Sequence, residues 1–229
     1  MEVYKGYIPE KMKYDMHVHT NYSLCSNLKP ETVLKLAKKK GLDGIAVADH
    51  NEIKGALKVK KLNKDKDFEV VIGSEIKTDK GDILAYYINK QIRSKELSDV
   101  LDEIKQQNGL AVIAHPYRLL PHLRFRCPIQ KIKDKVDGVE CLNSRASFLA
   151  NNLALTVSDK LGIAKLAGSD AHFAFEIGKA FTVFDGDLRK AIKNKKTKVE
   201  GSSFTGFIGG TMSFFLKRIN LIFKQPYGG

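Results

Sequence analysis

The stretch Tyr14-Asp15-Met16-His17-Val18-His19 decides the fold, because it has the pattern of a β-strand that ends in metal-binding side chains. Side chains two residues apart on a strand point to the same side of the sheet. His17 and His19 can therefore hold one metal ion together. A His-x-His pair is a weak sign when it stands alone, so its meaning depends on how the other strands end.

Other apolar runs along the chain also end in an acid or a histidine. These endings are Asp49-His50-Asn51, Glu75, Ala114-His115-Pro116, Glu140 and Ser169-Asp170-Ala171-His172. Active sites of α/β barrels lie at the carboxyl ends of the strands. Imidazole and carboxylate groups together suit Zn, Mn or Fe. The repeated placement predicts a polynuclear metal site assembled from most of the chain.

Short apolar runs alternate with helix-like stretches, which predicts βα units and a parallel sheet. Besides the strand at 14–19, the expected strands are 44–48, 69–72, 83–88, 110–114, 138–142, 163–167 and 180–184. The expected helices are 30–41, 54–64, 96–107, 129–136, 147–161 and 187–195. Pro30 is a start signal for the first of these helices, and Ser94 is the expected cap of the third.

The composition describes an ordinary globular chain with a strongly basic balance. Its 229 residues include 39 Lys and Arg against 26 Asp and Glu, so the formal net charge is +13. Such a field favours anionic partners, RNA included, although a lysine-rich solvated surface explains it equally well. The three cysteines lack a paired spacing, and no 18-residue uncharged apolar run occurs. We therefore expect a cytoplasmic protein without disulfides or a transmembrane segment.

Three polar residues are candidates for substrate binding. Arg118 and Arg145 each follow a ligand candidate by a few residues, and Asn51 follows another directly. A guanidinium group fits phosphate oxygens, whereas the alternative for either arginine is a surface salt bridge. No glycine-rich phosphate loop or serine nucleophile elbow is visible. His122 lacks such neighbours and is expected to be incidental.

The ordered motifs Asp-x-His-x-His, Asp-His-Asn, Gly-Ser-Glu, Ala-His-Pro, Glu-x-x-Asn and Gly-Ser-Asp-Ala-His resemble the PHP (polymerase and histidinol phosphatase) family of phosphoesterases. The match runs from about Tyr14 to His172. The resemblance implies an α/β fold, a distorted (βα)7 TIM-like barrel, over residues 1–200. It also implies two or three divalent metal ions (Mn, Zn, Fe or Mg) at the carboxyl ends of the strands.

The resemblance also implies a ligand set. One metal would be held by His17, His19, Glu75 and Asp170, a second would be shared between Glu75 and His115, and a third would be held by His50 and His172. Asp82 and Glu140 complete the candidate metal ligands. The catalytic candidates are His17, His19, Glu75, His115, Asp170 and His172.

Two positions depart from the family pattern. Many relatives carry Asp after the serine that corresponds to Ser23, where this chain has Leu24. The third metal therefore has one expected ligand fewer. Many relatives also carry a His where this chain has Asp82, and a carboxylate there would favour harder ions such as Mn or Mg.

The leading hypothesis is hydrolysis of a phosphate ester by metal-activated hydroxide. The substrate would be a nucleotide, an oligonucleotide end or a small phosphomonoester. A histidinol-phosphate phosphatase is the alternative of the same class. A non-catalytic PHP-like RNA-binding subunit is the alternative of another class. Amidohydrolase chemistry is disfavoured, because no lysine stands at a strand end as a candidate for carboxylation.

Residues 201–229 form an apolar, aromatic-rich tail. Gly209-Gly210 predicts that no single straight helix runs through it, since glycine is a poor helix former. We expect the tail to pack on the barrel or on a second subunit as a homo-oligomer contact. A helix lying on a membrane surface is the alternative, given Lys217 and Arg218.

Overall fold

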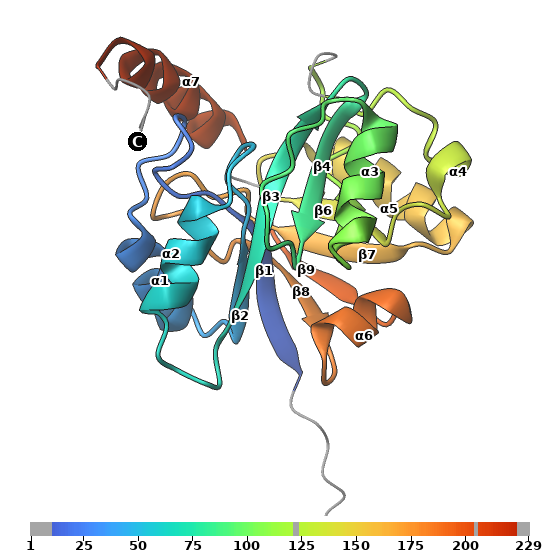
Figure 1. Ribbon diagram of the computed structural model, residues 1–229, viewed down its shortest axis with the longest axis horizontal. Helices are drawn as coiled ribbons and strands as arrows, with labels where there is room; N and C mark the ends of the chain where they lie inside the picture. Colours follow the sequence, from blue (N-terminus) through green and yellow to red (C-terminus); the bar gives the residue numbers. More distant parts are fainter. Residues whose placement is uncertain (1–10, 121–123, 204–205, 224–229) are drawn as a thin grey trace, which may run out of the picture.

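The computed structural model describes residues 11–120, 124–203 and 206–223. Eight strands close into a barrel, and a ninth extends the sheet beyond the eighth (Figure 1). The strands are β1 (Met12–Val18), β2 (Gly44–Val47), β3 (Glu69–Thr78), β4 (Gly81–Tyr86), β5 (Leu110–Ile113), β6 (Gly138–Asn143), β7 (Ala164–Gly168), β8 (Ala180–Phe184) and β9 (Lys198–Gly201). The predicted α/β barrel is confirmed. His122 lies outside the described residues.

The barrel is distorted because its strands are not all parallel. Strands β1 to β3 and β5 to β7 are parallel neighbours, whereas β4 runs antiparallel to both β3 and β5. Strand β8 runs antiparallel to β7 and to β1, and its pairing with β1 closes the barrel. The carboxyl ends of the parallel strands therefore still meet at one end of the barrel, where an α/β barrel carries its site.

Six helices cover the outside of the barrel. They are α1 (Pro30–Lys39), α2 (Lys54–Leu62), α3 (Leu97–Gln106), α4 (Ile129–Ile132), α5 (Phe148–Leu161) and α6 (Leu188–Lys193). Helices α1 and α2 lie on one side and α3 to α6 on the other (Figure 1). In α1, Val33 and Ala37 are four residues apart and fully buried, which is the spacing of an apolar helix face. Helix α5 begins at a side-chain cap from Ser147 and ends at Gly162, which is left-handed with φ 62°.

Several predicted boundaries differ from the structure. Helix α3 begins at Leu97 after Glu96, and the Ser94 hydroxyl donates to the Glu103 carboxylate instead of capping the helix. Strand β3 continues to Thr78, because its second half leaves β2 and pairs with β4. Strand β9 was not predicted from the sequence, because its four residues are mostly polar and exposed.

The predicted break at Gly209-Gly210 is wrong. Helix α7 (Gly206–Phe223) runs through both glycines. A Cβ atom at Gly209 would overlap the Glu176 carboxylate and lie 2.9 Å from an Arg145 nitrogen. Gly209 thus permits helix α7 to lie close to the barrel. This contact offsets the cost of a glycine in a helix, which is about 1 kcal/mol relative to alanine.

Helix α7 contacts the barrel through polar side chains and turns apolar ones outward. Ser213 accepts a hydrogen bond from Arg145 (2.7 Å), and the Asn220 amide donates to the Leu24 carbonyl (2.7 Å). The large exposed side chains of α7 are Met212, Phe214, Phe215, Ile219, Leu221 and Ile222. Among the helices in the described ranges, none combines the length and the hydropathy needed to cross a membrane.

Candidate metal centre

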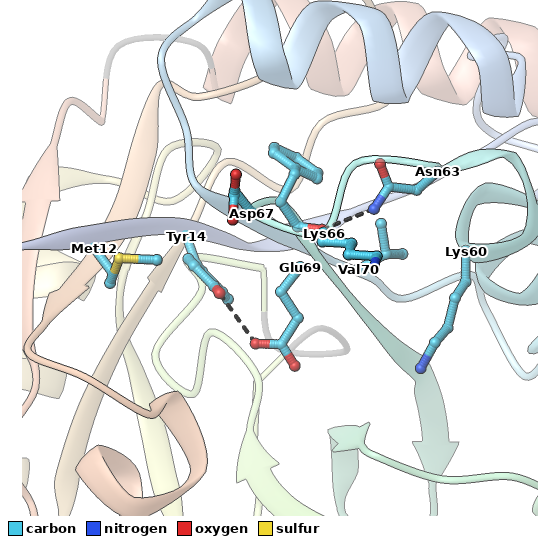
Figure 2. A pocket seen from close by; sticks show the side chains of 9 residues that line it. Met12, Tyr14, Lys60, Asn63, Lys66, Asp67, Glu69 and Val70 are labelled. Atoms are coloured by element: carbon cyan, nitrogen blue, oxygen red, sulfur yellow. Dashed lines mark hydrogen bonds between the residues drawn. The ribbon is translucent and has the colours of Figure 1, made fainter.

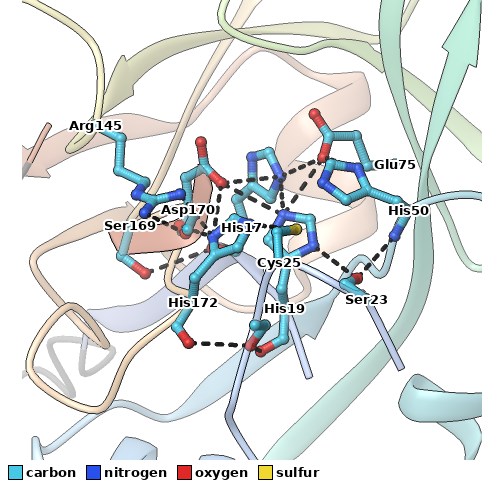
Figure 3. A network of polar contacts seen from close by, with 12 residues as sticks. His17, His19, Ser23, Cys25, His50, Glu75, Arg145, Ser169, Asp170 and His172 are labelled. Carbon is cyan, nitrogen blue, oxygen red and sulfur yellow. Dashed lines mark hydrogen bonds and ion pairs between the residues drawn. The ribbon is translucent and has the colours of Figure 1, made fainter. Parts of the chain in front are cut away.

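Short backbone bridges bring the histidine motifs together at the carboxyl end of the barrel. The amide of His19 donates to the Ala171 carbonyl (2.9 Å), and the amide of Ala171 donates to the His17 carbonyl (3.2 Å). In the same way, the Asn51 amide donates to the Glu75 carbonyl (2.9 Å). These bonds prolong the sheet past the strand ends, so the side chains of distant motifs converge on one buried space (Figure 3).

The first cluster lies around His17 of β1 and His19, which follows the end of that strand directly. The Nε2 atoms of His17 and His19 are 3.1 Å apart, and each lies 3.4 Å from Oε2 of Glu75. Asp170 Oδ1 lies 3.3 Å from His19 Nε2 and 3.9 Å from His17 Nε2. All four side chains are buried. Two imidazole nitrogens and two carboxylates that converge in this way form a donor set that fits a metal ion.

The second cluster shares Glu75 with the first. His115 Nε2 lies 2.9 Å from Oε1 of Glu75, and one ligand atom each from Glu75, Asp82 and His115 lie within 4.8 Å of one another. In the part of the chain that the structure describes, Nδ1 of His115 is buried and has no hydrogen-bond partner. One imidazole and two carboxylates grouped in this way form a donor set that fits a metal ion. The two oxygens of Glu75 thus face the two clusters.

Glu140 contacts this region but is already engaged. Its Oε1 accepts from Nδ1 of His17 (2.9 Å), and its Oε2 accepts from the His115 amide (2.9 Å) and from the Asn143 side chain (3.0 Å). A ligand atom of Glu140 also lies within 4.8 Å of ligand atoms of His17 and His115. These bonds suit a carboxylate that orients His17, because donation from Nδ1 leaves the lone pair of Nε2 toward Glu75.

The third cluster lies nearer the solvent. Ring nitrogens of His19, His50 and His172 lie within 4.8 Å of one another, and the His50 side chain is 43% exposed. Cys25 lies beside them, with its Sγ 3.1 Å from Nε2 of His172. Cys25 was missed in the sequence; the only available signal was its position next to Leu24, where a ligand was expected. Leu24 itself is 36% exposed.

The three substrate-binding candidates differ in their surroundings. Arg118 pairs with Asp170, and its Nε is buried without a hydrogen-bond partner among the described residues. Arg145 donates to Glu176 (2.9 Å) and Ser213, and its Nη1 lies 2.9 Å from Nδ1 of His172. The Asn51 side-chain oxygen accepts a hydrogen bond from the backbone amide of Lys77 on β3 (3.1 Å), which holds the Asn51 side chain against that strand. Glu176, which holds Arg145, was also missed in the sequence.

The electrostatics of the cluster favour a bound cation. Burial alone would lower the pKa of His17, but Glu140, Asp170 and Glu75 raise it well above its usual value. Burial would raise the pKa of Glu75, yet His50 and His17 hold it well below the ordinary range. Burial, together with the nearby charge of His50, lowers the pKa of His19 to about 4. His19 is therefore a neutral imidazole at pH 7, which is the form that binds a metal.

Two further carboxylates hold the loops around the clusters. Asp49 accepts from the Thr20 amide (2.8 Å), the Thr20 hydroxyl (2.6 Å) and the Ser23 hydroxyl (2.6 Å). Asp15 accepts from the Ser169 amide (2.8 Å), the Ser169 hydroxyl (2.5 Å) and the Gly178 amide (2.9 Å). Burial raises the pKa of both carboxyl groups to about 6. Asp49 therefore positions the loop after His19, and Asp15 positions the segment that carries Asp170 and His172.

A pocket at the opposite end of the barrel lacks comparable chemistry. It has a volume of about 600 Å³ and lies at the start of β1 and β3 (Figure 2). Lysine, apolar and acidic side chains line it, and the Tyr14 hydroxyl there donates to Glu69 (3.0 Å). No histidine or cysteine is among its described lining residues. The candidate site is therefore placed by its donor atoms and not by the size of a cavity.

The fold and the clusters define an α/β barrel with a candidate polynuclear metal centre. Residues 148–197 match the family model described as PHP-associated. The uncharacterized protein MJ1587 of Methanocaldococcus jannaschii is 39% identical over an alignment of 163 residues, and the match covers 63% of this chain and 90% of that protein. The uncharacterized protein MJ0417 of the same organism is 33% identical over an alignment of 181 residues, and the match covers 76% of this chain and 70% of that protein.

The solved structures agree on the fold. A two-domain protein from Bacteroides vulgatus, which contains a predicted PHP-like metal-dependent phosphoesterase, superposes with a TM-score of 0.73 at 17% identity. The match covers 85% of this chain and 66% of that one, so this chain spans just under two thirds of that protein. The chain belongs to the PHP family, and the resemblance found in its motifs is confirmed.

Proposed function

We propose that this protein is a metal-dependent phosphoesterase that hydrolyses a nucleotide, an oligonucleotide end or a small phosphomonoester. The observation that carries the proposal is the convergence of His17 Nε2 and His19 Nε2 on one oxygen of Glu75, each at 3.4 Å. The other oxygen of Glu75 lies 2.9 Å from His115. A carboxylate placed in this way suits a bridge between two divalent ions.

The proposed ligands divide among three positions. His17, His19, Glu75 and Asp170 would hold the first ion; Glu75, His115 and Asp82 the second; His50 and His172 the third. When bound, such ions supply Lewis acidity toward a phosphoryl oxygen and lower the pKa of water toward neutrality. Manganese, zinc, iron or magnesium fit this mixture of imidazole and carboxylate ligands.

Side chains of this chain would then bind and orient the ester. Arg118 is 19% exposed at the edge of the clusters, and its buried Nε has no hydrogen-bond partner within the described part of the chain. Its guanidinium group can exchange its pairing with Asp170 for two phosphoryl oxygens, which charge-assisted bonds favour. Glu140 would keep the ring of His17 in place through Nδ1. Arg145 is held by Glu176 and Ser213, so its reach toward a substrate is more restricted.

The donor set also bears on the alternatives. A histidinol-phosphate phosphatase would use the same clusters, so only a substrate screen separates it from a nucleotide phosphoesterase. A non-catalytic RNA-binding subunit has no need for the buried, charge-rich cluster around Glu75. RNA binding that survives chelation, without any hydrolysis, would favour that alternative.

The test is a metal-supplemented substrate screen. Purified protein would be given Mn, Zn or Mg with p-nitrophenyl phosphate, bis-p-nitrophenyl phosphate and a 5′-phosphorylated oligonucleotide. We expect hydrolysis of at least one ester, its loss on chelation, its return with added metal, and its absence in His17→Ala. Glu69→Gln, at the opposite end of β3, is the control that should remain active. Hydrolysis that withstands both chelation and His17→Ala would overturn the proposal.

A further inference from the structure

The third cluster contains a sulfur atom that the family pattern does not supply. The sequence left this position one expected ligand short, because Leu24 stands where the resemblance led us to expect Asp. In the structure the next residue, Cys25, points its Sγ at the third cluster, among His19, His50 and His172 (Figure 3). We propose that the Cys25 thiolate is a ligand of the third metal, together with His50 and His172, and that it makes this position selective for zinc. The inference rests on the metal centre of the proposed function.

The distances fit a shared ion. Cys25 Sγ lies 3.1 Å from Nε2 of His172. Two ligands at zinc–sulfur and zinc–nitrogen bond lengths, at a tetrahedral angle, are separated by about 3.5 Å. A shift of a few tenths of an ångström would therefore admit the ion. The His50 side chain also contacts Cys25, and its Nδ1 lies 2.9 Å from Glu75, which connects this position to the first cluster.

The loop that carries Cys25 is held against the segment after β7 that carries His172. The Ser26 hydroxyl donates to the His172 carbonyl (3.0 Å), and the Asn27 amide donates to the same oxygen (3.3 Å). On the other side, the Asn220 amide of α7 donates to the Leu24 carbonyl (2.7 Å). These three bonds flank Cys25, so its side chain is preorganised beside the imidazole.

The other buried cysteine shows what a structural thiol looks like in this fold. Cys141 is fully buried, its Sγ lies 3.6 Å from the Ala154 carbonyl, and burial raises its pKa to about 12. It contacts no imidazole among its described hydrogen bonds. Cys25 is only 7% exposed, yet its sulfur contacts ring nitrogens at the edge of the site. Packing in the core explains why Cys141 is buried, whereas the imidazole groups around Cys25 are those expected around a metal-binding thiolate.

The chemistry of the step is a proton exchange. Nδ1 of His172 lies 2.8 Å from the Asp170 carbonyl and 2.9 Å from Nη1 of Arg145. In the tautomer that donates from Nδ1 to the carbonyl, the lone pair of Nε2 points toward Cys25, and this is the form that would bind the metal. Metal binding would replace the thiol proton, which leaves to solvent through the exposed side of His50. The sulfur–hydrogen bond breaks and a sulfur–metal bond forms, with no change of oxidation state. A soft thiolate favours zinc over manganese or magnesium, in contrast to the carboxylate-rich position at Asp82.

Cobalt substitution tests the ligand without using turnover. Metal-free protein would be titrated with Co(II), and the near-ultraviolet thiolate-to-cobalt charge-transfer band would be recorded. We expect the band in the wild-type protein and in Cys127→Ser, and its absence in Cys25→Ser. Zinc content should fall by one ion per chain in Cys25→Ser, with the affinity of that position at least about 100-fold weaker. Ellman's reagent should modify Cys25 in metal-free protein, and zinc should protect it.

A second variant guards against misfolding. Cys25→Asp should recover the third ion without the charge-transfer band and should shift its preference from zinc toward manganese. Full metal content with no band in the wild-type protein, or unchanged zinc content in Cys25→Ser, would overturn the inference. A band without any hydrolysis would count against the proposed function alone. Hydrolysis with two ions and no band would count against Cys25 alone.

Discussion

Replacement of Glu75 by glutamine is the sharpest test of a shared metal centre. The two oxygens of Glu75 lie within 2.9 to 3.4 Å of nitrogens of four histidines: His17, His19, His50 and His115. Glutamine keeps the size of the side chain and one carbonyl oxygen but removes the negative charge. Because both oxygens face clusters, we expect Glu75→Gln to weaken two metal positions at once.

The expected size of the effect follows from Coulomb's law. Two unit charges 4 Å apart, at an effective dielectric constant of 20, interact by about 4 kcal/mol. A divalent ion doubles this interaction with the Glu75 carboxylate, and the amide dipole of glutamine restores part of what the substitution removes. We therefore take about 4 kcal/mol as the net loss of metal-binding free energy in Glu75→Gln. This value corresponds to roughly 10³-fold weaker binding, since each 1.4 kcal/mol is tenfold.

The assay combines metal content, binding and thermal stability. Metals per chain would be counted by plasma mass spectrometry, and affinities would be measured by calorimetry on metal-free protein. A metal present at 100 times its dissociation constant stabilises the folded protein by about 2.7 kcal/mol. For a chain of this size, that is a rise in Tm of about 5 to 11 °C. Wild-type protein should show this rise, and Glu75→Gln should lose most of it.

The matched control lies on the same strand. Glu69 is at the opposite end of β3, where it accepts a hydrogen bond from Tyr14 (3.0 Å), as Figure 2 shows. Glu69→Gln makes the same chemical change away from the clusters and should leave metal content and affinity unchanged. If Glu75→Gln binds as many ions as the wild type, with equal affinity, the shared centre is refuted.

Three further predictions address the surroundings of the site. Gly168→Ala would place a Cβ 2.6 Å from the backbone nitrogen of His17 and should lower the free energy of unfolding by about 1 to 3 kcal/mol. Gly210→Ala has open space around its Cβ and should stabilise α7. Thermal melts that rank the two variants in the opposite order would contradict this prediction. Asp82→His should keep two ions but shift their preference from manganese to zinc, measured by competition; loss of an ion would contradict it. Arg118→Lys should lower kcat/KM for a phosphoester about 10- to 100-fold at unchanged metal content, and unaltered kinetics would remove Arg118 from substrate binding.

The short apolar runs, regularly separated by helical stretches, were sufficient to predict βα units and a parallel sheet, and the resemblance of the motifs supplied the distorted barrel. The same regularity placed His17, His19, Glu75, His115 and Asp170 near one another, because the carboxyl ends of parallel strands meet at one end of a barrel. The apolar pattern of β4 does not encode its reversal, since a buried strand has the same composition in either direction, but the short turn at Lys80-Gly81 does indicate that β3 and β4 form a pair. That reversal lengthens β3, and Glu75 lies on the added part.

Contacts between loops were beyond the reach of the sequence. Cys25 meets His172 across 147 positions, and only the turn around Ser23 determines whether Leu24 or Cys25 faces the cluster. The sequence left open whether Arg145 binds phosphate or forms a salt bridge, because its partners, Glu176 and Ser213, are 31 and 68 residues away. Such pairings depend on the path of the chain and leave no periodic pattern in composition.

Arg145 also changes how the tail must be regarded. The sequence separates residues 201–229 from the barrel by composition, yet Ser213 of α7 and His172 of the third cluster contact the same guanidinium group. Gly209 brings the helix close enough for this contact, because any side chain there would overlap Glu176. A displacement of α7 would thus remove the Ser213 hydrogen bond from Arg145, whereas Glu176 would still hold its Nε. Helix α7 and the proposed third metal position are therefore connected through the side chain of Arg145.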